Sequence, residues 1–527
     1  MQDWNQRRWK LRWPEKIQEI VEMSSFDRRE FLRLGAACGA FFSQAAAAQA
    51  VPAPPVSRVP VKNRKDLVGI QVRGFSWVDE GIEAVLDNIQ EKGGVNTVWA
   101  YTFSYGEQRL EKNGSIPLPD HGKPGNTIAG GAFYDYDRRY FQNTILKDFR
   151  CNVYGDFNVI EAVASKAKAR GMSFFAWDLN NAGPTLNDTI PNYAEVSEVD
   201  VYGRRTNRPC FNHPDYRAFL SGKVESLLLG YPSEIDGIAW GSERMGPFDN
   251  MIGGVTTPSC FCGFCQAKAQ SLGISVARAQ AGYRELEQLF QAAARNQRPN
   301  DGYFIAFWRL LLRYPEILSW ESLWTDSFQE VQAHLYGMAK AIAPAKPFGF
   351  HLMQSMTFSP FYRAEEDYTK RRNFADFLKL ATYNTAGGAR MAKYLERLSA
   401  TVFRDATPPE FLEFYYKIMG YNEAPYDQLA STGLSADYVA RQTRQALEGV
   451  AGEVQIYPGI DINVPTLLKG DAAVKETTPA TVRASLEAAF GAGADGVILA
   501  REYAEMQLAN LSAAGDTLRE IFAQKKS

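Results

Sequence analysis

Histidine is scarce in this sequence, which has only 4 among its 527 residues: His121, His213, His334 and His351. A multi-histidine metal centre gathers several imidazoles at the strand ends of an enzyme, and one of these four stands only three residues after Cys210. The sequence therefore argues against enzymes that depend on a multi-histidine centre.

Long apolar runs and an excess of one charge are absent as well. Beyond the first fifty residues, no segment approaches the ~20 consecutive apolar residues that a membrane-spanning helix requires. The formal net charge is −2, and no stripe of lysine and arginine runs along the chain. We therefore expect no membrane span and no nucleic acid partner.

Cysteine is also sparse, since 6 residues in a chain of this length do not make a disulfide scaffold. Apolar residues, in contrast, make up 45% and charged residues 22%. That balance is typical of a globular protein with an ample core and excludes a disordered chain. Aromatic residues reach 13%, enough both to fill a core and to offer rings on which sugars stack.

The first fifty residues have the features of an export signal. Arg28 and Arg29 are followed by Glu-Phe-Leu, then by an apolar stretch from Leu34 to Phe42, and the segment ends in Ala48-Gln-Ala50. Paired arginines, a short apolar region and an A-x-A exit are typical of a twin-arginine signal peptide. We predict that residues 1–50 direct the protein to the periplasm or outside the cell.

Two further boundaries follow from this interpretation. Met23 stands just ahead of the paired arginines and is an alternative start, so that residues 1–22 need not be translated. Residues 51–65 contain four prolines and are expected to form an exposed linker. Residues 66–527 would then form the catalytic domain.

Beyond residue 65, short β-rich runs alternate with helical patterns. Strands are expected at 68–72, 96–103, 173–178, 237–243, 348–353, 377–383, 454–457 and 496–499. Helices are expected at 81–92, 157–170, 214–229, 276–342 with breaks near Pro299 and Pro315, 389–399, 436–450 and 479–490. Eight strand–helix units favour a (β/α)₈ TIM barrel with long insertions in its βα loops, an α/β fold.

A doubly wound open sheet is the alternative architecture. Such a sheet normally carries a glycine-rich phosphate loop after its first strand. Here Val72-Arg-Gly-Phe75 follows instead, which disfavours a nucleotide site.

In a barrel, the active site forms at the C-terminal ends of the strands. Polar residues stand at several predicted ends: Arg73, Tyr101, Asp178, Asn180, Glu243, His351, Asn384, Asp461, Arg501 and Glu502. Aromatic residues lie near the same ends. Because neighbours on a strand point to opposite faces, Trp177 and Asp178 do not both line the pocket.

The cysteines are clustered. Cys260-Phe-Cys262-Gly-Phe-Cys265 places three thiols within six residues, and Cys210 lies fifty residues upstream. Three thiols this close pair poorly as disulfides, but they can surround one tetrahedral ion. Four thiolates leave no open coordination position, so we predict a structural zinc site. The alternative is a set of buried or disulfide-bonded cysteines, and Cys151 is expected to be an ordinary buried thiol.

Three segments resemble family 42 glycoside hydrolases, the microbial β-galactosidases. Gly203–Arg217 resembles the family's segment that supplies the first zinc cysteine, followed by Asn-x-Pro-x-Tyr-Arg. Asp236–Glu243 is similar to the fourth barrel strand, which ends in the acid/base glutamate, and Ser259–Cys265 to the zinc-binding loop. The resemblance covers 203–273 and implies a TIM barrel, a structural zinc and glycosidase chemistry with Glu243 as the acid/base.

The sequence also departs from that family. Ser242 stands where the family has an asparagine that usually holds the sugar hydroxyl next to the scissile carbon. No glutamate on the predicted seventh strand matches the family's nucleophile. The chain therefore resembles an outlying relative rather than a plain β-galactosidase.

Glycoside cleavage needs two carboxyl groups, one protonated and one ionised. Asp461 and Glu502 end late strands, and either is a candidate to face Glu243. An apolar wall such as Trp240 would raise the pKa of Glu243, and Arg244 would lower it if that side chain points inward.

These patterns together predict an exported glycosidase that cleaves an oligo- or polysaccharide by a two-carboxylate, retaining mechanism, with no catalytic cofactor. The expected substrate contacts are Arg73, Tyr101, Asp178, Trp240 and His351. Two alternatives stay open: a glycan-binding barrel without catalysis, and a barrel enzyme of another class, such as a lyase.

Overall fold

The computed structural model describes residues 66–107, 120–122, 129–180, 184–253, 257–466 and 474–525. The predicted signal peptide over 1–50 and the linker over 51–65 lie outside these residues, so both stay predictions. In the described part of the chain, no helix has the length and apolar character needed to cross a membrane.

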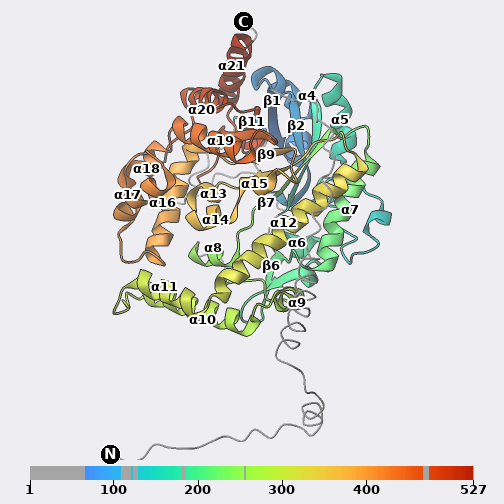
Figure 1. Ribbon diagram of the computed structural model, residues 1–527. Helices are drawn as coiled ribbons and strands as arrows, with labels where there is room; N and C mark the ends of the chain where they lie inside the picture. Colours follow the sequence, from blue (N-terminus) through green and yellow to red (C-terminus); the bar gives the residue numbers. More distant parts are fainter. Residues whose placement is uncertain are drawn as a thin grey trace, which may run out of the picture. The chain divides into compact units, whose positions relative to one another are not determined.

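A closed barrel of eight parallel strands forms the centre of the fold (Figure 1). Its strands are β1 (Leu67–Val72), β2 (Thr97–Glu107), β4 (Ser173–Asn180), β7 (Gly237–Ser242), β8 (Phe348–Leu352), β9 (Phe377–Leu380), β10 (Gln455–Asp461) and β11 (Gly496–Ala500). The order is β1-β11-β10-β9-β8-β7-β4-β2, and pairing of β1 with β2 closes the ring. The predicted TIM barrel is confirmed, and the open sheet is excluded.

Helices that follow the strands cover the barrel. They are α3 (Gly74–Asp79), α4 (Ile82–Asp87) continued by η1 (Asn88–Lys92), α5 (Val159–Ala169), α7 (Pro214–Gly230), α12 (Glu316–Ile342), α19 (Ala436–Val450), α20 (Pro479–Gly491) and α21 (Leu508–Gln524). Pro315 stands directly before α12, where its missing N–H costs no helical hydrogen bond.

The connections between strands and helices carry large insertions. After β7 come α8 (Pro247–Ile252), α9 (Gly263–Ser271), α10 (Val276–Ala294) and α11 (Tyr303–Arg313); after β8 come α13 (Ser355–Phe358), α14 (Pro360–Glu365) and α15 (Tyr368–Arg371); after β9 come α16 (Asn384–Ala400), α17 (Pro408–Met419) and α18 (Tyr426–Thr432). These insertions begin at the C-terminal ends of the strands, where barrels place their active sites.

Smaller insertions follow the other strands. They are β3 (Ala129–Ala132) and η2 (Arg138–Phe141) after β2, then α6 (Pro184–Thr189), η3 (Tyr193–Val196), β5 (Ser197–Val199) and β6 (Arg205–Pro209) after β4, and η4 (Tyr503–Glu505) after β11. The short strand β3 pairs antiparallel with β2, and β5 pairs antiparallel with β6.

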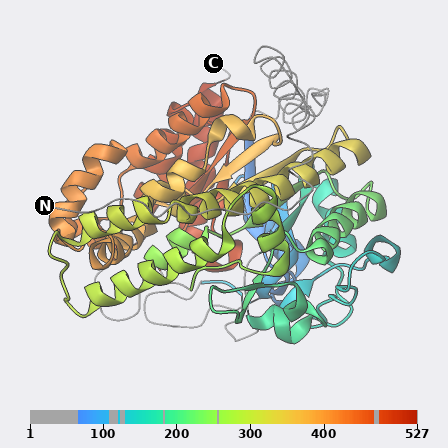
Figure 2. The same cartoon turned by 60° about the horizontal axis from the view of Figure 1, so that its bottom comes forward.

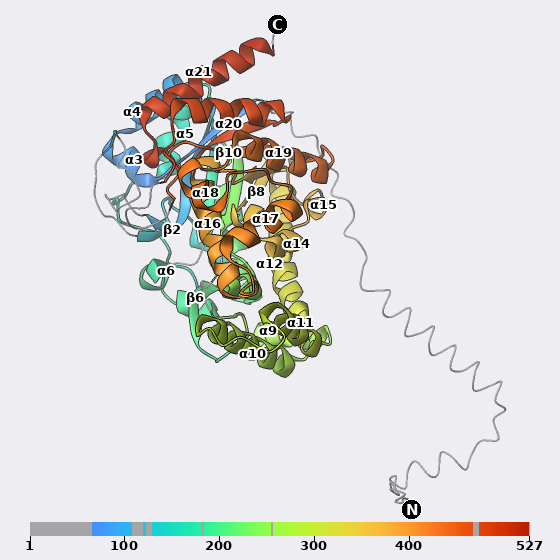
Figure 3. The same cartoon turned by 90° about the vertical axis from the view of Figure 1, so that its left-hand side faces the viewer.

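The views show where the insertions lie. Helices α10 and α11 are at the opposite end of the barrel domain from α20 and α21 (Figures 1 and 3). With the α10 and α11 end turned forward, the lime and yellow helices lie across the front (Figure 2).

The barrel interior is filled by aromatic rings. Trp99, Phe175, Trp177 and Phe377 pack in one cluster, with ring centroids 5.6 to 6.1 Å apart around Trp99. The close packing of Phe377 requires glycine at position 349, since a Cβ on Gly349 would lie 2.3 Å from the carbonyl oxygen of Phe377. Part of the aromatic surplus in the sequence is therefore barrel core.

Candidate active site

A cavity of about 400 Å³ lies at the C-terminal ends of β7, β8 and β9. Its wall combines residues from strand ends with residues from the insertion helix α16. The residues that line it include Glu243, Met245, His351, Met353, Ala381, Tyr383, Arg390, Lys393, Tyr394, Arg397 and Arg501.

Glu243 directly follows β7 and extends into this cavity. Its side chain is 34% exposed, whereas His351 on β8 is 4% exposed. Oε1 of Glu243 lies 3.5 Å from Nε2 of His351. The barrel thus brings together Glu243 and His351, two of the polar residues that the sequence placed at strand ends.

The polar groups around Glu243 favour its ionised form. Burial acts to raise the pKa of Glu243, but His351, Arg501 and Lys379 together outweigh burial and hold this pKa at about 2. Burial, reinforced by Lys379, lowers the pKa of His351 to about 4. In the ligand-free protein at neutral pH, Glu243 is therefore a carboxylate beside a neutral imidazole.

Neither of the two sequence neighbours considered for the pKa of Glu243 faces the cavity. Trp240 is fully buried on the outer face of β7, with its ring 6.0 Å from that of Phe328 on α12. Arg244 points away from the cavity and forms a buried ion pair with Glu198.

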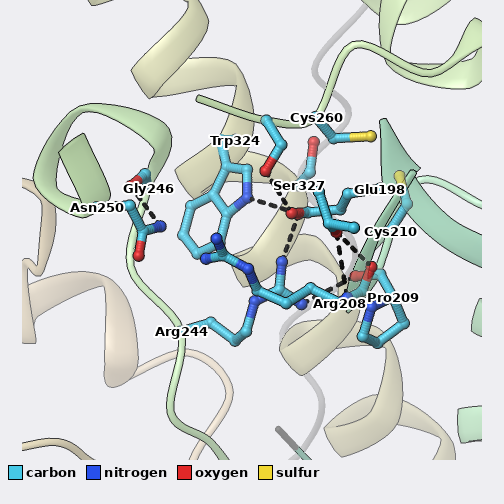
Figure 4. Close-up of polar contacts among 12 residues, drawn as sticks. Glu198, Arg208, Pro209, Cys210, Arg244, Gly246, Asn250, Cys260, Trp324 and Ser327 are labelled. Carbon is cyan, nitrogen blue, oxygen red and sulfur yellow. Dashed lines mark hydrogen bonds and ion pairs between the residues drawn. The ribbon is translucent and has the colours of Figure 1, made fainter. Parts of the chain in front are cut away.

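Arg244 and Glu198 connect the loop after Glu243 to the cysteine cluster. Nη1 of Arg244 donates a hydrogen bond of 2.9 Å to the carbonyl oxygen of Pro209, and Oγ of Ser259 donates one of 2.7 Å to Glu198. Pro209 and Ser259 each directly precede a cysteine of the cluster. Figure 4 shows the Glu198 carboxylate beside Arg244, with Cys210 and Cys260 close by.

The four predicted metal-binding cysteines come together as the sequence indicated. The sulfurs of Cys210, Cys260, Cys262 and Cys265 all lie within 4.8 Å of one another. Sγ of Cys210 is 3.6 Å from that of Cys262 and 3.5 Å from that of Cys265. None of the cysteines in the described segments is in a disulfide.

This cluster fits a tetrahedral metal ion. Zinc–sulfur bonds of ~2.3 Å in a tetrahedron place the sulfurs ~3.8 Å apart, close to the observed separations. Backbone and side-chain N–H groups of Asn212 approach the sulfurs of Cys210 and Cys265 at 3.4 and 3.3 Å, as expected around thiolates.

Asp461 lies at the end of β10 but not among the residues that line the cavity. Its carboxylate accepts hydrogen bonds from the backbone N–H groups of Ala386 and Val464, both at 2.9 Å, and from Oγ1 of Thr477 at 3.0 Å. Burial raises its pKa. In this conformation Asp461 holds the start of α16.

Glu502 is also engaged elsewhere. It forms a buried ion pair with Arg73, whose guanidinium lies 4.7 Å from the centroid of the Tyr101 ring. Arg73 further donates a hydrogen bond of 2.6 Å to the carbonyl oxygen of Gly106. None of Glu502, Arg73 and Tyr101 lines the cavity that holds Glu243.

Asp178 and Trp240, which were expected to contact a substrate, are buried and do not line this cavity. Asp178 is fully buried and pairs with Lys223 of α7 at 2.8 Å. Trp177, its neighbour, points into the barrel. The predicted alternation is therefore right, but the outward side chains belong to the barrel–helix interface.

Sequence reasoning missed the part of the wall that α16 contributes. Arg390, Lys393 and Arg397 are three and four residues apart, the spacing that places side chains on one helix face. The helix over 389–399 was predicted, so the spacing was readable, but nothing in the sequence told which face meets the cavity.

Comparisons with known proteins give fold-level likenesses. No protein-family model matches the sequence, and no curated protein matches it. A β-galactosidase from the psychrophilic Marinomonas ef1 aligns with 87% of this chain and 60% of its own, at 10% identity and a TM-score of 0.49. A family 42 β-galactosidase from G. stearothermophilus aligns with 88% and 57%, at 11% identity and a TM-score of 0.48.

An α-L-fucosidase from Paenibacillus thiaminolyticus aligns with 88% of this chain and 50% of its own, at 12% identity and a TM-score of 0.45. The chain thus spans only about half to three-fifths of the length of these proteins. Likenesses this distant carry no weight for the reaction, which depends on the site itself.

Proposed function

We propose that this protein is a glycoside hydrolase that cleaves an O-glycosidic bond of an oligo- or polysaccharide. The observation that carries the proposal is the position of Glu243: a carboxylate at the end of the fourth barrel strand, in a cavity at the barrel mouth. A volume of about 400 Å³ falls within the ~300–1,000 Å³ of small-molecule pockets.

We assign Glu243 the role of general acid/base in a retaining mechanism. A general acid must hold its proton at the working pH, whereas the cations around Glu243 keep its pKa at about 2 in the ligand-free protein. Bound substrate that displaces water and offsets these cations would raise this pKa. An ionised Glu243 also suits the nucleophile, so the test must separate the two roles.

Leaving-group dependence provides that test. Glu243→Gln keeps the shape and removes the proton, and general acid/base help amounts to roughly 10²–10⁴-fold. The loss should be large on glycosides with poor leaving groups and small on activated aryl glycosides, whose departure needs no proton. An equal loss on both would assign Glu243 to nucleophilic attack, and wild-type rates on both would remove it from catalysis.

For the second carboxylate we propose Asp461, with Glu502 as the alternative. Asp461 shares Arg390 and Tyr383 with Glu243 as electrostatic neighbours, whereas Glu502 interacts with Arg73. Asp461→Asn and Glu502→Gln, measured beside Glu243→Gln, would identify the partner, because loss of the nucleophile abolishes turnover of poor and activated substrates alike.

A glycan-binding barrel without catalysis is the second candidate. Among the described residues that line the cavity, Glu243 is the only carboxylate, and hydrolysis needs two. Saturable glycan binding without turnover, unaffected by Asp461→Asn, would favour this candidate.

We further propose that the four-cysteine cluster holds one structural zinc ion and that the protein is exported by the twin-arginine route. The support for zinc is the fit of four thiols to a closed tetrahedral site. The support for export is the sequence around Arg28 and Arg29 alone. Zinc in a closed site would stabilise the loop and take no part in bond cleavage.

A further inference from the structure

The cavity that holds Glu243 is lined by an excess of positive charge. Arg390, Lys393, Arg397 and Arg501 all line it, and the described lining residues supply one carboxylate in return. The whole chain, in contrast, has a formal net charge of −2. The excess of cations is therefore a local property of this cavity.

Arg390 is held in place by neutral groups. It donates a hydrogen bond of 3.0 Å to Oε1 of Gln354 and another to the carbonyl oxygen of Pro465. Its guanidinium lies 5.7 Å from the centroid of the Tyr383 ring, and its buried Nε has no hydrogen-bond partner. Arg390 is thus fixed at the cavity wall by hydrogen bonds to neutral groups rather than to a carboxylate.

Lys393 and Arg397 continue the same helix face outward. Within the described residues, neither forms an ion pair with a carboxylate. At 1.5 Å of rise per residue, the three cations of α16 extend over roughly 10 Å of helix axis. Arg501 differs from them, because it forms an ion pair with the buried Glu505.

A further amine, that of Lys379, lies beneath the residues that line the cavity. Lys379 on β9 is fully buried and donates a hydrogen bond of 2.5 Å to the hydroxyl of Tyr383. Burial lowers the pKa of Lys379 to about 7, and burial followed by the charge of Arg501 lowers the pKa of Arg390 to about 10. Beyond the effect of burial, Arg501 and Arg390 also lower the pKa of Lys379, so these three cations repel one another, and a bound anion would relieve that repulsion.

We propose that this cavity binds an acidic saccharide, one whose sugar rings carry carboxylate or sulfate groups that pair with Arg390, Lys393 and Arg397. The proposal rests on the proposed function, since it names the substrate class of the same site. Planar guanidinium groups bind carboxylate and sulfate oxygens through paired, charge-assisted hydrogen bonds. A neutral sugar would bring no negative charge to the three cations of α16.

The proposal also bears on Glu243. A ligand anion bound to these cations adds a negative charge to the cavity that holds Glu243, and this charge opposes the positive field of Arg501 and Lys379 that now stabilises the Glu243 carboxylate. Its pKa would then rise on binding, toward the range that a general acid requires. A neutral ligand would leave that field in place.

The experiment measures binding with Glu243→Gln protein, so that turnover does not consume the ligand. Calorimetry would compare uronate oligosaccharides with their carboxyl-reduced counterparts, and sulfated oligosaccharides with their desulfated counterparts. We expect at least one acidic member to bind at least tenfold more tightly than its neutral counterpart, with the preference reduced by salt. The two series distinguish carboxylate from sulfate.

Adding Lys393→Gln and Arg397→Gln should abolish the preference without unfolding α16, because glutamine is a good helix former. Lys370→Gln with Lys417→Gln is the matched control: it removes two exposed cations that do not line the cavity and should leave the preference intact. The proposal is overturned if no acidic oligosaccharide binds, if neutral counterparts bind equally well, or if the α16 double variant keeps the preference.

Product analysis with wild-type protein separates this proposal from the proposed function. Hydrolysis of the preferred acidic glycan supports both. Acidic binding with unsaturated uronate products, or with no product, supports the charge preference and contradicts hydrolysis. Hydrolysis confined to neutral glycans supports the hydrolase and overturns the charge preference.

Discussion

Arg244 donates a hydrogen bond of 2.9 Å to the carbonyl oxygen of Pro209, the residue before Cys210. Because Arg244 directly follows Glu243, this bond ties the loop of the candidate acid/base to the first residue of the cysteine cluster. Damage to the cluster should therefore displace Glu243 as well as destabilise the fold.

Metal analysis should find about one zinc ion per chain, and Cys262→Ser should lower the melting temperature by about 5 °C or more, because a closed thiolate site contributes folding free energy. Activity should fall with it through the Arg244 connection. Cys151→Ser is the control, since Cys151 lies outside the cluster, and should leave the zinc content unchanged. A stoichiometric disulfide among the four cysteines would contradict the zinc site.

The second prediction concerns the contribution of Glu243 to the stability of the protein and how this contribution depends on pH. Its folded pKa of about 2 lies below the ordinary value of 4.5. A depressed carboxyl pKa contributes stability above the ordinary value, and this contribution is lost as the pH falls through the folded pKa. Glu243→Gln should therefore lower the melting temperature at pH 7, and the difference from wild type should shrink below about pH 4.5.

Glu413→Gln is the matched control, because Glu413 is exposed on α17 and its replacement should change the melting temperature little at either pH. A Glu243→Gln variant that is more stable than wild type at pH 7 would show that the surrounding cations do not stabilise the carboxylate.

A buried group of carboxyls predicts pH dependence of the opposite sign. Burial raises the pKa of Glu321 to about 8, and burial followed by the charge of Glu321 raises that of Glu365 to about 10. Stability from such groups is complete below the ordinary value of 4.5 and is lost as the pH rises toward the folded pKa. Chemical denaturation should therefore give a falling free energy of unfolding between pH 5 and pH 8.

Glu321→Gln should reduce that slope by up to about 1.4 kcal/mol per pH unit, the value for one proton. The glutamine oxygen can still accept the hydrogen bond of 2.8 Å from the backbone N–H of Phe248. An unchanged slope in this variant would mean that Glu321 is ionised in the folded protein at pH 7.

Gly388 sets the contact between α16 and α18. A Cβ at this position would lie 2.1 Å from the backbone carbonyl oxygen of Leu429, so Gly388→Ala should cost about 1–3 kcal/mol of unfolding free energy. Gly337→Ala in α12 is the control, since a Cβ there meets nothing within 4 Å and should add up to ~1 kcal/mol of helix stability. Equal stability of the two variants would contradict the close approach.

Export is tested by Arg28→Lys combined with Arg29→Lys. If the twin-arginine interpretation is right, the double variant should accumulate in the cytoplasm as uncleaved precursor, whereas the wild-type protein should begin near Val51 after cleavage. Fractionation with immunoblotting measures both. Unchanged export of the double variant would mean that another route is used.

The sequence predicted the barrel well because strand and helix periodicities are local properties. All eight predicted strands are present, and the breaks near Pro299 and Pro315 separate three real helices. The cysteine cluster was equally readable, since three of its four members lie within six residues. Glu243 was located by its place at the end of a strand.

What the sequence could not predict was the direction of side chains at the barrel mouth. Asp461 and Glu502 end strands as expected, yet one is held by backbone N–H groups and the other by Arg73. Likewise, the hydrogen bond and the charges that lower the pKa of Glu243 come from β8, β9 and the segment after β11 rather than from its neighbours in sequence. The contacts of Glu243 and Glu502 join residues more than a hundred positions apart, and Asp461 and Ala386 are 75 positions apart.

Helix α16 carries its cations on an insertion, whereas Glu243 belongs to the barrel. Two contacts position this helix. Asp461 accepts a hydrogen bond from the N–H of Ala386 in its first turn, and Gly388 packs against α18. Neither anchor involves the face that meets the cavity. Exchange of Lys393 and Arg397 would therefore alter the charge that the cavity presents to a ligand while the position of Glu243 stays the same.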